Sequence, residues 1–242
     1  MTVDNIEDLS SQYADFDFNK ASLFETPIGK ETLQHQLNFL LKKVDGSTAS
    51  AKYIMEVHKA IENLASSFFD IDMTIKLIEF AHPKIKSFKM TRVDRGEYLQ
   101  YHFENYYFRL PKIKDQALQL LNVVFRMGHK QSPTLEKHVL KNEKVIQGNF
   151  TAFILYLEDA FKSIIDLRHT IAHRANVSGS DIAMITSYQF TAYDKEIYEL
   201  NVKSLVSKTI KLKFNQGRIK QCIIALLLML EADYNQVKAS LG

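Results

Sequence analysis

One short segment of the chain combines side chains that can cleave a phosphodiester bond. Arg168 carries a permanent positive charge, and His169 and His173 carry imidazoles that exchange protons near neutral pH. An arginine can bind a phosphate and stabilise the charge that develops on it, while a histidine serves as general acid or base. This chemistry needs no metal ion. We therefore expect a catalytic site that uses no cofactor and no metal.

The helical pattern of residues 150–174 predicts how these side chains are placed. At about 100° per residue, one apolar stripe contains Phe150, Phe153, Ile154, Leu157, Phe161, Ile164 and Ile171. Arg168 falls in the middle of this stripe, where a guanidinium needs an anionic partner or an open cleft. His173 projects about 140° away from Arg168. One helix does not easily close both around one phosphate. A helix that frays at its end would remove this difficulty, and so would two copies of the chain that meet across a two-fold axis, which is the arrangement we expect.

Two other interpretations of the same residues stay open. His169 and His173 lie four residues apart, a spacing compatible with two metal ligands on one helix face, with Asp166 as a third. No His-Glu-x-x-His pattern and no cysteine cluster supports that metal site. Alternatively, Arg168 forms a structural ion pair while both histidines lie on the surface. The candidate carboxylates for that pair are Glu104 and Asp115.

Charge is distributed unevenly along the chain. The formal net charge is +3, but residues 1–27 hold six acids against one lysine, a net −5 that leaves the remainder at +8. Basic residues concentrate in segments 126–148 and 203–220. A basic body favours a polyanion such as RNA through counterion release. RNA is therefore the predicted partner. The alternative is that these lysines are ordinary solvated residues on exposed helix faces.

Composition and periodicity predict an all-α fold. Four prolines and eight glycines in 242 residues suit long helices. We expect an up-and-down helical bundle with extra N-terminal helices, in which residues 1–27 are an acidic, loosely ordered lead-in and 28–242 form a single helical domain. Alternating residues permit a short hairpin within 184–214, although helix fits the neighbouring residues equally well. Helices are expected over residues 31–44, 49–69, 73–88, 112–127, 150–174 and 218–237.

Targeting signals and disulfides are not expected. The N-terminus lacks a basic start followed by an apolar region, and the longest apolar run, Cys222 to Leu230, has nine residues, too few to cross a bilayer. The single cysteine cannot form an intramolecular disulfide. We expect a cytoplasmic protein without a membrane partner.

The motif Arg168-His169-x3-His173, closing an amphipathic helix in an all-α chain, resembles that of the HEPN superfamily (higher eukaryotes and prokaryotes nucleotide-binding), in its stand-alone bacterial type. The family pattern is Arg, then typically Asn, His or Asp, then three or so residues, then His. The resemblance covers a helical bundle over about residues 95–240. It implies a metal-independent endoribonuclease that works as a homodimer, of a toxin or phage-defence type, with an antitoxin or activating partner. Inactive binding modules also occur in the family.

The resemblance also implies roles for the motif residues. The ribose 2′-OH attacks the adjacent phosphate and leaves a 2′,3′-cyclic phosphate and a 5′-OH. His173 is the leading general acid or base, Arg168 holds the phosphate, and His169 orients the substrate or shares proton transfer. The alternative function is a non-catalytic helical module that binds nucleic acid or a protein partner.

Four further residues are predicted to contact the substrate. Arg174 adds positive charge directly beside the motif. Asp115, Asn122 and Arg126 share the polar side of the helix expected at 112–127, where they could line a cleft or part of a dimer face. An ordinary solvated helix face is the alternative. Aromatic residues between positions 98 and 108 could stack on bases, although core packing is the commoner role.

Overall fold

The computed structural model of the protein describes residues 17, 21–80, 95–161 and 195–242. Within these residues the regular secondary structure is helical, and the predicted all-α fold is confirmed. The chain divides into two compact units: one contains residues 1–67, 112–160 and 218–242, and the other contains 68–111 and 161–217. The single helical domain predicted over residues 28–242 stays a prediction.

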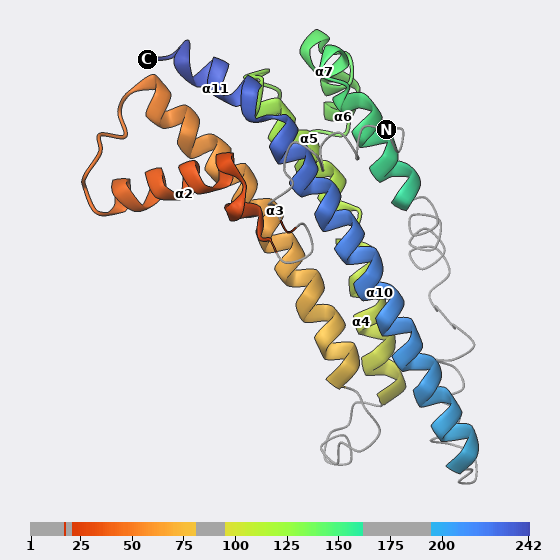
Figure 1. The fold of residues 1–242 in the computed structure, drawn as a ribbon. Coiled ribbons are helices and arrows are strands. Elements are labelled where there is room, and N and C mark those ends of the chain that lie inside the picture. The colour runs from red at the N-terminus through yellow and green to blue at the C-terminus, as the bar shows by residue number, and fades with distance from the viewer. Residues whose placement is uncertain (1–16, 18–20, 81–94, 162–194) are drawn as a thin grey trace. The chain divides into compact units, whose positions relative to one another are not determined.

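The first unit gathers helices from both ends of the chain around two stacked tyrosines. Its elements are α2 (Pro27–Leu40), the first part of α3 (Ala49–Phe80), α5 (Lys112–Val124), α6 (Leu135–Val139), α7 (Glu143–Gln147), a helix through residues 150–161, the end of α10 (Lys195–Met229) and α11 (Glu231–Ala239). Helix α11 contacts both α2 and α5 (Figure 1). The buried rings of Tyr53 and Tyr234 stack with centroids 5.6 Å apart, and the Tyr53 hydroxyl donates to the Val124 carbonyl at 3.0 Å. This contact joins α3, α5 and α11.

The end of the acidic segment is built into this unit. A short 3-10 helix, η1 (Leu23–Glu25), precedes α2, and the side chains of Ala21, Leu23 and Thr26 are buried. Thr26 caps α2: its hydroxyl accepts from the Gly29 amide at 3.2 Å and donates to the Leu23 carbonyl at 2.7 Å. Residues 21–26 therefore pack into this unit ahead of α2.

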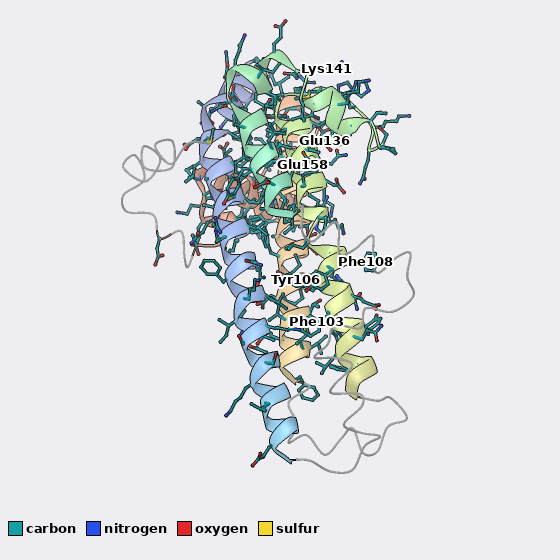
Figure 2. All side chains as sticks on the ribbon, turned by 90° about the vertical axis from the view of Figure 1, so that its right-hand side faces the viewer. Phe103, Tyr106, Phe108, Glu136, Lys141 and Glu158 are labelled. Atoms are coloured by element: carbon teal, nitrogen blue, oxygen red, sulfur yellow. The ribbon has the colours of Figure 1, made fainter. Side chains whose placement is uncertain are left out.

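The second unit contains the later part of α3, helix α4 (Arg95–Arg109) and the earlier part of α10. Figure 2 shows Phe103 and Tyr106 of α4 on the side that faces α10, and Phe108 on the other side. The Tyr106 hydroxyl donates to the Leu212 carbonyl at 3.3 Å. Ion pairs connect Arg109 of α4 with Asp70 of α3, and Lys213 of α10 with Glu79 of α3. Core packing is therefore confirmed for two of the aromatic residues of α4.

One expected break between helices is wrong, and the hairpin alternative is excluded over part of its range. The break expected between residues 69 and 73 does not occur, because α3 continues to Phe80 with Ile71, Ile75 and Ile78 fully buried. The hairpin within 184–214 is excluded over residues 195–214, which belong to α10, and residues 184–194 lie outside the described residues. A strand would place Ile210, Leu212 and Phe214 on one face. Instead Leu212 is 6% exposed, while Ile210 and Phe214 are 63% and 64% exposed.

Candidate functional site

A buried helical stripe leads toward the predicted catalytic motif. Within residues 150–161, the side chains of Phe150, Phe153, Ile154, Leu157 and Phe161 are at most 2% exposed, as the helical periodicity predicted. The motif residues follow directly along the chain. Arg168, His169, His173 and Arg174 lie outside the described residues. Their roles, and the alternatives in which Asp166 joins a metal site or Arg168 forms a structural ion pair, therefore stay predictions.

Asn122 has a structural role in this unit. Its side chain is 6% exposed, its Nδ2 donates to the His129 carbonyl at 2.9 Å, and its Oδ1 accepts from the His129 amide at 3.1 Å. Both ends of the carboxamide are therefore engaged by the backbone of one residue seven positions later. This arrangement holds the segment after α5 against the helix. Because both polar groups of its side chain are bonded in this way, we propose no substrate contact for Asn122.

Arg126 forms the turn that ends α5. The helix ends at Val124, and Arg126 has φ +52, in the left-handed region. The Arg126 amide donates to the Val123 carbonyl at 3.0 Å and the Met127 amide donates to the Asn122 carbonyl at 2.9 Å. These two bonds define a Schellman motif with Arg126 at the position that usually holds glycine. Gly128, two residues later, also has a positive φ of +70. The Arg126 side chain is exposed and remains a candidate for RNA contact.

Asp115 lies at the junction of two polar hollows in the surface of the first unit. One has a volume of about 390 Å³ and extends toward Ser132 and Glu136. The other has a volume of about 490 Å³ and extends toward Lys59 and Asn63 of α3. The two hollows share Asp115, Gln119 and Gln131. Asp115, which was predicted to contact the substrate, therefore lines a cleft in the surface of the first unit.

Basic residues in segment 126–148 keep their charge exposed. Glu136 is held by Lys114, whose Nζ lies 2.9 Å from Oε2 of Glu136 and 4.0 Å from Oε1 of Glu158 (Figure 2). Within the described residues, Lys130, Lys137 and Lys141 are not in ion pairs and are exposed. Because Glu136 is engaged elsewhere, it does not neutralise these lysines.

Two exposed histidines accompany this basic surface. The rings of His129 and His138 stack with centroids 4.9 Å apart and an interplanar angle of 26°. In the other basic segment, Lys213 is paired with Glu79, while the side chain of Lys211 is exposed. Segment 126–148 is therefore the stronger candidate for contact with a polyanion.

Two further kinds of feature are absent from the described part of the chain. There, no group of three or more His, Cys, Asp or Glu side chains could hold a metal ion. Likewise, none of the helices described is both long and apolar enough to cross a bilayer.

Comparison with known proteins identifies one family. A family model described as Cthe2314-like HEPN matches residues 53–232, which is 180 of the 242 residues. The matched range begins within α3, includes the segment with Arg168, His169 and His173, and ends within α11. No curated protein and no solved structure matches the chain.

Proposed function

Because this chain belongs to the HEPN family, we propose that it is an endoribonuclease that cleaves RNA without a metal ion. The observation that carries the proposal is the position of Arg168-His169-x3-His173 within the family-matched residues. These residues follow the buried helical stripe of residues 150–161. The exposed positive charge of segment 126–148 supports RNA as the substrate.

The proposed reaction is an internal transesterification. A histidine, with His173 as the leading candidate, removes the proton from a ribose 2′-OH, and the 2′-oxygen attacks the adjacent phosphorus. The bond from phosphorus to the 5′-oxygen breaks, and that oxygen leaves as a 5′-OH after it receives a proton from a general acid. Arg168 binds the non-bridging oxygens and stabilises their developing charge. His169 orients the substrate or shares the proton transfer, and Arg174 adds positive charge beside the site.

We further propose that the working form is a homodimer. On an ideal helix Arg168 and His173 project about 140° apart, so two motifs facing each other across a two-fold axis would supply both groups to one phosphate. The proposed context is a cytoplasmic toxin or phage-defence nuclease controlled by an antitoxin or activating partner. Light scattering at micromolar concentration tests the dimer, and a monomer would contradict it.

The decisive experiment is cleavage of single-stranded RNA by purified protein in EDTA. We expect products with 2′,3′-cyclic phosphate ends, and we expect Arg168→Ala and His173→Ala to abolish cleavage without changing the melting temperature. His35→Ala is the matched control, because His35 lies outside the family-matched residues. Cleavage that requires Zn²⁺ or Mn²⁺ would instead favour the metal site at His169 and His173. A large loss of stability in Arg168→Ala would indicate a structural ion pair.

The second candidate is a non-catalytic module that binds nucleic acid or a protein partner. The basic surface of segment 126–148 favours its nucleic-acid form, because a binding module needs that surface and no catalytic residues. RNA binding without cleavage, weakened by Lys137→Ala and unchanged by His173→Ala, would establish this alternative.

A further inference from the structure

Two imidazole rings lie face to face on the surface of the first unit, within the basic segment 126–148. The rings of His129 and His138 stack with centroids 4.9 Å apart and an interplanar angle of 26°, and both side chains are exposed. His129 lies in the segment that follows α5, whereas His138 lies in α6. The stack therefore brings together, from two elements, two groups that exchange protons near neutral pH.

The backbone that carries the two rings is fixed on both sides of the stack. The carboxamide of Asn122 bonds both backbone groups of His129, at 2.9 and 3.1 Å. In α6, which contacts α5, Leu135 and Val139 on either side of His138 are 4% and 0% exposed. A pair of rings held in this way loses little conformational entropy when a ligand binds.

Lysines flank the histidine pair in the sequence. Lys130 directly follows His129, Lys137 directly precedes His138, and Lys141 comes three residues after His138. All three lysine side chains are exposed, and within the described residues none of them is in an ion pair. Because consecutive Cα atoms are about 3.8 Å apart, the long side chains of Lys130 and Lys137 can reach a ligand held by the two rings.

The carboxylates around the pair are fewer than the cations and have other neighbours. The charged residues of segment 126–148 and of α5, which contacts α6, are Lys112, Lys114, Asp115, Arg126, Lys130, Glu136, Lys137, Lys141, Glu143 and Lys144. Glu136 receives two hydrogen bonds from Lys114, at 2.9 and 3.0 Å. Asp115 and Glu136 line the smaller hollow, whose lining includes neither histidine, and Glu143 lies in the first turn of α7. Within the described part of the chain, neither imidazole is paired with a carboxylate.

This arrangement selects an anion as the ligand. Two protonated imidazoles in one stack repel each other, and an anion bound at their edges offsets that repulsion. The oxygens of a phosphate accept hydrogen bonds from imidazolium N–H groups and from lysine ammonium groups. Because the anion favours the form in which both rings are protonated, binding takes up protons and strengthens as the pH falls. A neutral or cationic ligand gains nothing from such a pair.

We infer that the stacked pair of His129 and His138 binds a backbone phosphate of single-stranded RNA, as a contact additional to the proposed cleavage motif. The flanking lysines engage the neighbouring phosphates of the same strand. Phosphate contacts position a nucleic acid without reading its sequence, so the pair contributes to affinity and not to base preference. The inference rests on the proposed function, because it takes RNA as the source of the phosphate.

Binding of a single-stranded 2′-O-methyl oligonucleotide to the full-length protein tests the inference, because this probe lacks the 2′-OH needed for cleavage. Fluorescence anisotropy measures its affinity at about pH 5.5 and about pH 7.5, on either side of the range in which imidazole titrates. We expect the wild type to bind about tenfold more tightly at the lower pH. The double variant His129→Gln, His138→Gln should lose most of this difference. Its melting temperature should be unchanged, since both rings are exposed.

Two matched controls lie outside the basic segment. His35→Gln, in α2, should keep the full pH dependence of the wild type. Lys137→Gln should lower the slope of log affinity against log salt by about 0.7, the contribution of one phosphate contact on a single strand. Lys43→Gln, an exposed lysine just after α2, should leave that slope unchanged. Excess inorganic phosphate should displace the oligonucleotide only weakly, because a free phosphate gains no contact between neighbouring phosphates and the lysines.

Three results would overturn the inference. They are a double variant whose affinity changes with pH as much as that of the wild type, a wild type that does not bind the oligonucleotide at either pH, and complete displacement by inorganic phosphate, which would assign the pair to a free anion. Cleavage of unmodified RNA together with the first result would refute the inference alone. Binding whose pH dependence is lost in the double variant, by a protein that cleaves no RNA, would support the phosphate contact and refute the nuclease.

Discussion

Replacing Asn122 with leucine should destabilise the first unit by an amount that the structure defines. The two residues have similar volumes, so the substitution removes hydrogen bonds and creates little cavity. The lost bonds are those between the Asn122 carboxamide and the backbone of His129, at 2.9 and 3.1 Å. Each such bond contributes about 0.5–1.5 kcal/mol to stability. We expect a total loss of about 2 kcal/mol, the middle of the range set by two such bonds.

Urea denaturation followed by circular dichroism measures this loss. We expect a lower midpoint with an unchanged m-value, together with a decrease in melting temperature of about 4–8 °C for a chain of this size. Hydrogen exchange adds a local readout, because the His129 amide should lose protection in Asn122→Leu. Asn38→Leu is the control: it removes one exposed bond from Gln34, 3.1 Å long, and should change stability by less than about 0.5 kcal/mol. An Asn122→Leu variant as stable as the control, with His129 still protected, would refute the reasoning.

Three further substitutions or titrations test other features of the fold. Arg126→Gly should raise the free energy of unfolding by about 1 kcal/mol. Removing the side chain at φ +52 relieves about 1–2 kcal/mol of backbone strain, and the greater freedom of glycine in the unfolded chain offsets part of this gain. Lower stability in urea would contradict the Schellman assignment. Gly29→Ala should lower the melting temperature although alanine favours helix, since the new Cβ would lie 2.2 Å from the Leu23 carbonyl oxygen. A higher melting temperature would show that the backbone of η1 moves away from the new Cβ at little energetic cost. Burial lowers the pKa of His58 and of His102 below the ordinary value for histidine, so their contribution to stability is complete above that ordinary value and is lost as the pH falls through the folded-state values. Urea midpoints at about pH 8 and pH 5 should differ less in the His58→Leu, His102→Leu double variant than in the wild type, and an equal difference would assign the pH dependence to other groups.

Local patterns in the sequence determined the helical fold and the family motif. The stripe at residues 150–161 is buried as its helical spacing predicted, and Ile113, Ala117 and Leu120 of α5 are likewise fully buried at helical spacing. Helix α4 ends at Arg109, two residues before Pro111, because proline disfavours helix in the residue before it. Such features depend on residues a few positions apart. The motif at Arg168 and His173 likewise indicated the family that matches residues 53–232.

Tertiary contacts decided the features that a linear pattern leaves ambiguous. Asn122 has the spacing of a polar helix face, and it becomes buried because the chain turns back and presents the backbone of His129. The alternation at residues 209–214 fits a strand as well as a helix, and packing of Leu212 against the second unit's core selects the helix. The hollows at Asp115 form where α5 lies beside α3 and beside the returning segment at Gln131. In each case the deciding group is distant in the sequence, or is a backbone atom that exists in every sequence, so no pattern of side chains could reveal it.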